Sequence, residues 1–336
     1  MKKLAVLIPT YNSAQYLKES IDSILNQTYS NFDVYVYDDF STDNSKEIIE
    51  SYTDRRVFYR KNDQNLGISK TLNKGLEELL SQYQFIARMD ADDWAFPERF
   101  QRQIDFLEKN EYIMLCGTQG FWLENIAENP SSGWEYPIRN NYLKLYLLFG
   151  ASFGHSSIIL RSNFFISNNL KYDENIKTCE DWDLWIRVSQ KGEVQNLPDF
   201  LMKYRIVQTS NHRSAENKNI HLKERAVIIS NYWKTFNIDL FPEEVFELYY
   251  GSHDNLKHGF KIKLKKIIDS FNKLFINNTN DLKKEDISKF QYLLARKIYD
   301  FWKRSNISTY NPIIWFIILT KVKFICTVRL VNSQLK

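Results

Sequence analysis

The sequence predicts an α/β fold with a mostly parallel central sheet flanked by helices, followed by a mainly α-helical C-terminal extension. Short apolar runs alternate with segments of helical periodicity between Leu4 and Asp93, which is the pattern of βαβ units. After about Ser214 the composition shifts toward Lys, Asn, Ile and Phe, and helical periodicity recurs. We therefore expect one domain over residues 1–214 and a helical region over residues 215–336.

Four apolar segments are predicted to form the parallel strands. The continuous apolar run Leu4–Ile8 has the pattern of a strand that is buried on both faces. Val34–Tyr37, Val57–Tyr59 and Phe85–Met89 follow as shorter strands. Ligands of such sheets bind beyond the carboxyl ends of the strands, so the residues that follow these strands are the candidate site.

The helices of the first domain are predicted from 3.6-residue periodicity and from their start signals. Ser13 can cap a helix through Leu25, and a helix is expected around Lys46–Tyr52. Leu66–Gly67 opens another helix that reaches about Leu80.

The pattern is less regular beyond Ile113. His155–Arg161 is expected to be a strand, Glu180–Gln190 a helix, and Phe200–Ile206 a further strand. The boundary of the first domain is expected within residues 210–218.

Composition excludes several classes of protein. The formal net charge of +4 is too small for a dedicated nucleic-acid binder, which usually shows a clustered basic face. Three distant cysteines without a CxxC pair, Cys116, Cys179 and Cys326, predict a reducing compartment and no structural zinc site. Because the first strand begins at once and no signal peptide precedes it, we expect a cytoplasmic protein. Neither a GxGxxG nor a P-loop motif occurs.

The acidic cluster Asp90-Ala91-Asp92-Asp93 follows the fourth strand directly. Its carboxylates repel one another unless a cation or a set of hydrogen-bond donors offsets them. Mg²⁺ and Mn²⁺ prefer oxygen ligands and leave coordination positions open for phosphates. A metal-diphosphate site therefore explains the cluster, and a solvated turn or helix N-cap is the alternative.

Three further loops carry polar groups at the predicted edge. Tyr11, in Pro9-Thr10-Tyr11-Asn12, could stack on a nucleobase or be a packed aromatic at the rim. In the segment 38–43, the carboxylate of Asp38 or Asp39 could accept a hydrogen bond from a nucleobase or a ribose. Capping of the following helix by the polar residues of this segment is the alternative. Gly67, in Asn65-Leu66-Gly67-Ile68, would let the backbone approach a ligand, or could belong to an ordinary helix start.

Glu180-Asp181-Trp182-Asp183-Leu184-Trp185 opens the predicted helix at residue 180. A carboxylate at a helix N-terminus can act as a general base when it faces a ligand. Capping by the acidic residues, with two core tryptophans, is the alternative.

The order of these motifs resembles glycosyltransferase family 2, the inverting enzymes of GT-A fold common in bacterial surface-polysaccharide synthesis. The resemblance covers roughly residues 2–212. The matching stretches are Val6–Asn12, Asp38–Asp43, Asn65–Gly67, Asp90–Asp93, His155–Ser157, Glu180–Trp185 and Tyr204–Arg205.

The resemblance implies a role for each matched residue. The residues expected to bind the donor are Pro9, Thr10, Tyr11, Asp39, Asn65, Gly67, Asp90 and Ala91. Thr10, Tyr11 and Asp39 would hold the nucleobase, usually uracil, and Asp90 would contact the ribose or sugar. Asp92 would bind Mn²⁺ or Mg²⁺, Asp93 would shape the turn, and Asp181 would be the catalytic base.

The chain departs from the family pattern at three places. Phe40 stands where the family usually has glycine, so the turn after Asp39 is expected to differ. Gly154 replaces an acidic residue of some relatives, which leaves the role of base to Asp181. The histidine that many relatives carry after the Tyr-Arg pair is absent at about Val207, and His212 is the nearest substitute.

The expected function is transfer of a sugar from a nucleotide-diphosphate sugar, usually a UDP-sugar, to a hydroxyl of a glycan or lipid-linked acceptor. Lipopolysaccharide, capsule or another surface polysaccharide would be the product. The alternatives are a sugar-nucleotide nucleotidyltransferase and a non-catalytic nucleotide-sugar-binding protein. Pro9-Thr10-Tyr11-Asn12 lacks the Gly-rich basic loop of the first alternative, and Asp92 and Asp181 disfavour the second.

The final apolar stretch, Pro312–Val331, raises the question of a membrane. It contains Lys321, Lys323 and Arg329, and each central cation costs about 2.5–3.5 kcal/mol on insertion scales. We therefore expect a segment on the inner-membrane surface rather than a spanning helix, helped by the basic run at residues 261–266. A buried C-terminal helix or strand is the alternative.

Overall fold

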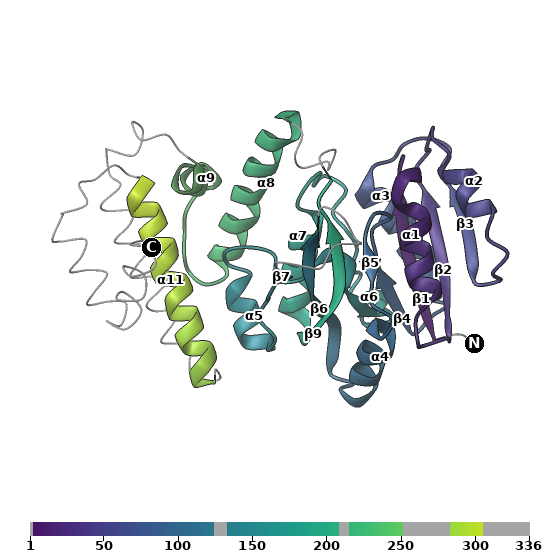
Figure 1. The fold of residues 1–336 in the computed structure, drawn as a ribbon. Helices are drawn as coiled ribbons and strands as arrows, with labels where there is room; N and C mark the ends of the chain where they lie inside the picture. Colours follow the sequence, from purple (N-terminus) through teal and green to yellow (C-terminus); the bar gives the residue numbers. More distant parts are fainter. Residues whose placement is uncertain (1–2, 124–132, 208–214, 251–282, 305–336) are drawn as a thin grey trace. The chain divides into compact units, whose positions relative to one another are not determined.

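The computed structural model describes residues 3–123, 133–207, 215–250 and 283–304 (Figure 1). The chain divides into two compact units, Met1–Lys218 and Asn219–Lys336. The first unit is built around one twisted sheet.

The sheet of the first unit is parallel in its first half and mixed in its second. Its strands are β1 (Leu4–Thr10), β2 (Phe32–Asp38), β3 (Val57–Lys61), β4 (Phe85–Arg88), β5 (Trp94–Ala95), β6 (Ile113–Leu123), β7 (Gly133–Trp134), β8 (Ile159–Arg161) and β9 (Glu193–Arg205). The order is β3-β2-β1-β4-β8-β6-β9-β5, with β7 beside β6. The pairs among β1 to β4 are parallel, β8 lies antiparallel between β4 and β6, and β6 and β9 pair in parallel. The predicted α/β class is confirmed.

Helices flank this sheet. They are α1 (Ala14–Leu25), α2 (Ser45–Glu50), α3 (Ile68–Leu79), α4 (Arg99–Lys109), α5 (Asn140–Tyr146), the short 3₁₀ helix η1 (His155–Ser157), α6 (Ser162–Ser167) and α7 (Glu180–Lys191). The helices predicted from periodicity correspond to α1, α2, α3 and α7. The segment 155–161, expected to be one strand, instead forms η1 followed by β8.

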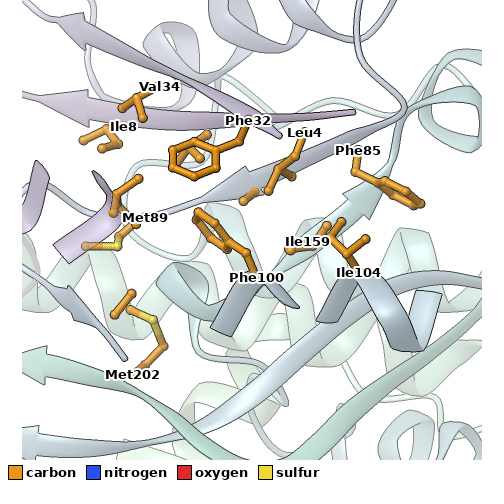
Figure 2. Packing of buried hydrophobic residues seen from close by; sticks show 14 of the residues in the cluster. Leu4, Ile8, Phe32, Val34, Phe85, Met89, Phe100, Ile104, Ile159 and Met202 are labelled. Atoms are coloured by element: carbon orange, nitrogen blue, oxygen red, sulfur yellow. The ribbon is translucent and has the colours of Figure 1, made fainter. Parts of the chain in front are cut away.

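The core lies between the parallel strands and the helices that cover them. Side chains of β1 and β2, among them Leu4, Ile8 and Phe32, meet α4 in one apolar cluster (Figure 2). The rings of Phe32 and Phe100 pack edge to face with their centroids 5.5 Å apart. Arg99, the neighbour of Phe100, is also fully buried and donates to the Arg88 carbonyl at the end of β4 over 3.0 Å.

The described part of the second unit is helical. It contains α8 (Ala215–Lys234, which begins at the end of the first unit), α9 (Pro242–Tyr250) and α11 (Lys284–Arg304). Trp233 is its largest fully buried side chain among the described residues. None of the described helices is both long and apolar enough to cross a membrane. The segments 261–266 and Pro312–Val331, for which the sequence predicted a basic run and a membrane contact, lie outside the described residues.

Candidate active site

The carboxyl ends of β1, β2 and β4 meet at one edge of the sheet, as parallel pairing requires. Thr10 at the end of β1 lies opposite Asp38 at the end of β2, and the Asp39 N–H donates to the Thr10 carbonyl over 2.8 Å. Pro9 precedes Thr10 inside β1. The Thr10 side-chain oxygen is buried and has no hydrogen-bond partner among the described residues.

Asp38 and Asp39 both hold loops of this edge in place. Asp38 accepts a hydrogen bond from the Ser41 N–H over 2.8 Å and another from the Tyr59 hydroxyl over 2.8 Å. Asp38 is fully buried, and these hydrogen bonds make it part of the turn.

Asp39 organises the loop that precedes α3. Its carboxylate accepts from the backbone N–H groups of Leu66 and Gly67 and from the Asn62 amide, each over 2.8 Å. Gly67 has φ +83°, in the left-handed region that glycine adopts without steric cost. A carboxylate has about four acceptor sites, so Asp39 keeps room for one further donor. Asn65, predicted to bind the donor, is exposed in the same loop.

The turn after Asp39 keeps the left-handed backbone that a glycine would provide. Phe40 has φ +69°, and the Ser41 N–H still closes the turn onto Asp38. The expectation that this turn differs from that of relatives with glycine stays a prediction. The backbone is held by its hydrogen bonds, and the phenyl ring, 43% exposed, lies at the surface.

Asp90, Asp92 and Asp93, which we call the acidic triad, lie together after β4. Each offers one carboxylate oxygen, and these oxygens all lie within 4.8 Å of one another. Asp93 is only 1% exposed, and its Oδ2 is buried without a hydrogen-bond partner. An orphaned carboxylate oxygen inside such a cluster fits a hard divalent cation, which binds oxygen ligands. Asp93 thus offers an additional ligand oxygen, beyond the turn-shaping role expected from the sequence.

Arg88 anchors the triad to the sheet. Its guanidinium is nearly fully buried and binds both oxygens of Asp90, at 2.6 Å for Oδ2 and in a very short contact for Oδ1. Ser156 of η1 donates to Asp90 Oδ2 over 3.0 Å and accepts from the Asp90 N–H over 3.0 Å. Ala91 lies buried between Asp90 and Asp92. Asp90 is therefore fixed in position, whichever ligand it meets.

Arg205 at the end of β9 supports the same turn from the other side. Its backbone N–H donates to Asp93 Oδ1 over 3.0 Å, and its Nε donates to the Asp92 carbonyl over 3.0 Å. The guanidinium also pairs with Glu19 of α1 and lies 4.3 Å from the centre of the Tyr16 ring. The predicted Tyr-Arg pair thus shapes the acidic turn through Arg205.

The triad holds more negative charge than its surroundings offset. Burial and the neighbouring Asp90 raise the pKa of Asp92 to about 7, and burial with Asp92 raises the pKa of Asp93 well above its usual value. Desolvation disfavours the charged carboxylates, and a bound cation would reverse that preference. The residues present therefore fit the Mn²⁺ or Mg²⁺ that the sequence predicts.

The N-terminus of α7 brings Asp181 into the same electrostatic environment. Burial raises the pKa of Asp181 to about 6. Two contacts act in the opposite direction and lower this pKa: the Trp182 N–H, which donates to Oδ1 over 2.6 Å, and the positive charge of Arg88. Asp90 raises this pKa further. The short helix η1 links the two regions, because its Ser156 donates to Asp90 and its His155 lies 4.0 Å from the carboxylate of Glu180, the residue before Asp181.

The neighbours of Asp181 carry no free negative charge at neutral pH. Burial and Asp181 raise the pKa of Glu180 to about 8. His155 Nδ1 lies 4.0 Å from the Glu180 carboxylate, and His155 Nε2 lies 2.8 Å from the Tyr172 hydroxyl. Burial lowers the pKa of His155 well below its usual value, so the ring stays neutral. Burial thus raises the pKa of both Glu180 and Asp181.

Gly154 lies close to the indole of Trp134. A Cβ added at Gly154 would lie 3.0 Å from Trp134 Cζ2, a tight contact that would require the indole to shift by a few tenths of an ångström. The indole is held by a hydrogen bond from Nε1 to the Thr118 carbonyl. His212, weighed as a substitute metal ligand, lies outside the described residues.

We expect the pH dependence of kcat to follow the ionisation of Asp181. A general base works only when deprotonated, so kcat should fall as the pH drops through about 6 and reach a plateau above about 7. Steady-state rates from pH 5 to 8.5 measure this acidic limb. A rate that stays level down to pH 5 would contradict a base with a raised pKa.

Comparison of sequences identifies close relatives. The profile of Glycosyl transferase family 2 matches residues 5–167. An uncharacterized glycosyltransferase of Haemophilus influenzae is 33% identical over 251 residues, which cover 70% of this chain and 76% of that protein. Uncharacterized glycosyltransferase MJ1057 of Methanocaldococcus jannaschii is 32% identical, with 69% of this chain and 84% of that protein covered.

Comparison of structures shows a shared fold. Staphylococcus aureus TarS, solved in complex with UDP, superposes with a TM-score of 0.56 at 19% identity, covering 99% of this chain and 92% of that chain. Mannosyltransferase PcManGT of Pyrobaculum calidifontis, solved with GDP-Man and Mn²⁺, gives a TM-score of 0.51 at 12% identity, covering 91% and 88%. At these identities the likeness is one of fold.

Proposed function

This chain belongs to glycosyltransferase family 2, and from that premise we propose that it moves a sugar from a UDP-sugar to a hydroxyl of a glycan or lipid-linked acceptor. One observation carries the proposal. The acidic triad and the start of α7, which carries Asp181, are linked through η1, where Ser156 donates to Asp90 and His155 lies 4.0 Å from Glu180. Membership of the family favours glycosyl transfer over the nucleotidyltransferase and the non-catalytic binding protein.

The donor would lie along the carboxyl ends of β1, β2 and β4. Thr10, Tyr11 and Asp39 would hold the base, with Asp39 open to one more donor. Asp90, held by Arg88 and Ser156, would contact the ribose or the sugar. The complexes of TarS with UDP and with UDP-GlcNAc support a uridine donor.

The chemistry needs one base and one leaving group. The acceptor hydroxyl attacks the anomeric carbon from the face opposite the diphosphate, and Asp181 takes its proton during the attack. The bond between the anomeric carbon and the diphosphate oxygen breaks, and the nucleoside diphosphate leaves. A single displacement of this kind inverts the anomeric configuration.

The acidic triad would hold the cofactor. Asp92, with Asp93 and Asp90 beside it, would bind Mn²⁺ or Mg²⁺, which when bound offsets the charge that grows on the leaving diphosphate. The Mn²⁺ in the complex of PcManGT supports this choice of metal.

The acceptor pathway and the location follow from the resemblance of the sequence. Lipopolysaccharide, capsule or another surface polysaccharide is the proposed product. The reaction would then take place in the cytoplasm, at the inner face of the membrane.

A thermal-shift screen of UDP- and GDP-sugars, each with and without Mn²⁺, tests the proposed function. We expect a rise in melting temperature with one UDP-sugar that depends on the metal, because ligands that bind the native state stabilise it. A protein that responds to no nucleotide in the presence of Mn²⁺ would contradict the proposal.

A further inference from the structure

Phe40 occupies a backbone conformation that its side chain disfavours. Its φ of +69° lies in the left-handed region, where a Cβ crowds the following carbonyl. The ring is 43% exposed, so little burial offsets the strain. The hydrogen bond that closes this turn comes from the Ser41 backbone and would form equally with glycine at position 40. Strain of this kind persists in folded proteins mainly where a function uses the residue.

The turns that carry Phe40 and Tyr11 are adjacent, at the end of the sheet where the nucleotide would bind. The segments that carry them are joined by hydrogen bonds from the Asn12 N–H to Ser41 Oγ, 2.9 Å, and from the Thr42 N–H to Asn12 Oδ1, 2.8 Å. Tyr11 is 50% exposed. Two exposed aromatic rings are therefore presented by adjacent, cross-linked turns.

The surroundings of these rings suit a nucleobase. Lys61 at the end of β3 places its Nζ 5.4 Å from the centre of the Phe40 ring. Asp39, between Phe40 and the end of β2, keeps one acceptor position, and the Thr10 hydroxyl is buried without a hydrogen-bond partner among the described residues. A flat ligand with polar edges could contact aromatic faces and these polar groups at once.

We propose that Phe40 and Tyr11 form an aromatic clamp on the base of the nucleoside diphosphate. The assignment of Phe40 rests on the proposed function and deepens it, because it adds a residue that binds donor where the family usually has glycine. Tyr11 supplies one ring and Phe40 the other. The free energy gained by stacking on the base offsets the strain of the left-handed backbone at Phe40.

The test compares Phe40→Gly and Phe40→Tyr with the wild type by calorimetric titration. Stacking on one aromatic ring is worth about 5- to 100-fold in affinity, so Phe40→Gly should weaken UDP binding in the presence of Mn²⁺ by about that factor. Phe40→Tyr should bind UDP within about two-fold of the wild type, because it keeps the ring. Inorganic pyrophosphate with Mn²⁺, which has no base, should bind all three proteins equally.

The stability of the same variant separates a binding role from a structural one. Phe40→Gly relieves the strain of the left-handed backbone, which stabilises the folded state, but it also raises the conformational entropy of the unfolded chain, which destabilises it. The melting temperature of this variant should therefore equal that of the wild type or exceed it by about 1–4 °C. Tyr112→Ala removes an equally exposed aromatic at the start of β6, the opposite edge of the sheet, and should leave UDP affinity unchanged.

The outcomes distinguish this inference from the function on which it rests. A wild-type protein that binds neither UDP nor pyrophosphate with Mn²⁺ would overturn the proposed function and the clamp together. Wild-type binding of UDP that survives unchanged in Phe40→Gly would overturn the clamp alone. Equal losses of UDP and pyrophosphate affinity, or a lower melting temperature of the glycine variant, would assign Phe40 to the turn instead.

Discussion

Replacing Asp181 with asparagine is expected to lower kcat for glycosyl transfer by about 100- to 10,000-fold, the usual contribution of a positioned general base. The amide keeps the shape of the side chain and can still accept from the Trp182 N–H. It has no basic oxygen for the proton of the acceptor hydroxyl. Release of the nucleoside diphosphate from the donor, measured at saturating donor and acceptor, gives kcat.

Asp183 provides the matched control for Asp181. It lies in the same first turn of α7, where it pairs with Arg187 at 2.6 Å. Asp183→Asn should cost about 0.3–0.5 kcal/mol of stability, typical of such helix pairs, and leave kcat within about two-fold. If the Asp181→Asn variant had the same kcat as the Asp183→Asn variant, the base would have to be another group, with Glu180 as the nearest candidate.

Asp92→Asn is expected to abolish metal-dependent nucleotide binding while stabilising the metal-free protein. The pKa of Asp92 is raised to about 7 in the folded state, so ionising it in the absence of a cation opposes folding. The neutral amide removes this opposition and, with it, a metal ligand. The apo variant should therefore be more stable than the wild type by about 1–3 kcal/mol at pH 8.

The pH dependence gives the sign of this effect. Because the folded pKa lies above the unfolded one, the cost is absent below about pH 4, grows as the pH rises, and levels off above about 7. Thermal unfolding in the presence of a chelator, from pH 4 to 8, measures it. Asp105→Asn, on the exposed face of α4, should follow the wild-type curve. If the Asp92→Asn variant were less stable than the wild type at pH 8, this would contradict a destabilising effect of the ionised Asp92 on the metal-free protein.

Much of the fold could be predicted because β1 to β4 carry continuous apolar runs. A strand buried on both faces leaves such a run, as Leu4–Ile8 shows. The helix α4 and the long strand β6 were missed, although Phe100, Ile104 and Leu107 of α4 are buried on one face. The buried polar residues among them, such as Arg99 and Gln103, interrupt the apolar pattern that local reading depends on.

The candidate site was predictable where its chemistry is concentrated in short segments. Asp90-Ala91-Asp92-Asp93 and Glu180-Asp181 are such segments, and the structure brings them together. Arg88 was missed, although a lone arginine inside the apolar run Phe85–Met89 signals a buried charge that needs a carboxylate. Its partnership with Ser156, 68 positions away, depends on tertiary structure that no local pattern contains.

Two residues show that a motif match predicts where a residue lies more readily than what its side chain does. Asp39 was expected to bind the base, yet it first binds the loop at Leu66 and Gly67. Phe40 was expected to alter the turn after Asp39, where the Ser41 N–H donates to Asp38 and Phe40 itself has φ +69°. In both cases backbone donors, which the sequence does not display, decide what the side chain is free to do.

The central claim is that the acidic triad and a nucleoside diphosphate together hold a divalent cation. Electron paramagnetic resonance of Mn²⁺ tests it directly, because the signal of the free hexa-aqua ion falls when the ion binds. We expect UDP to increase the amount of Mn²⁺ bound by the wild type, and Asp92→Asn to leave Mn²⁺ at the level of UDP alone. Equal Mn²⁺ binding by the two proteins in the presence of UDP, or none by the wild type, would contradict the account.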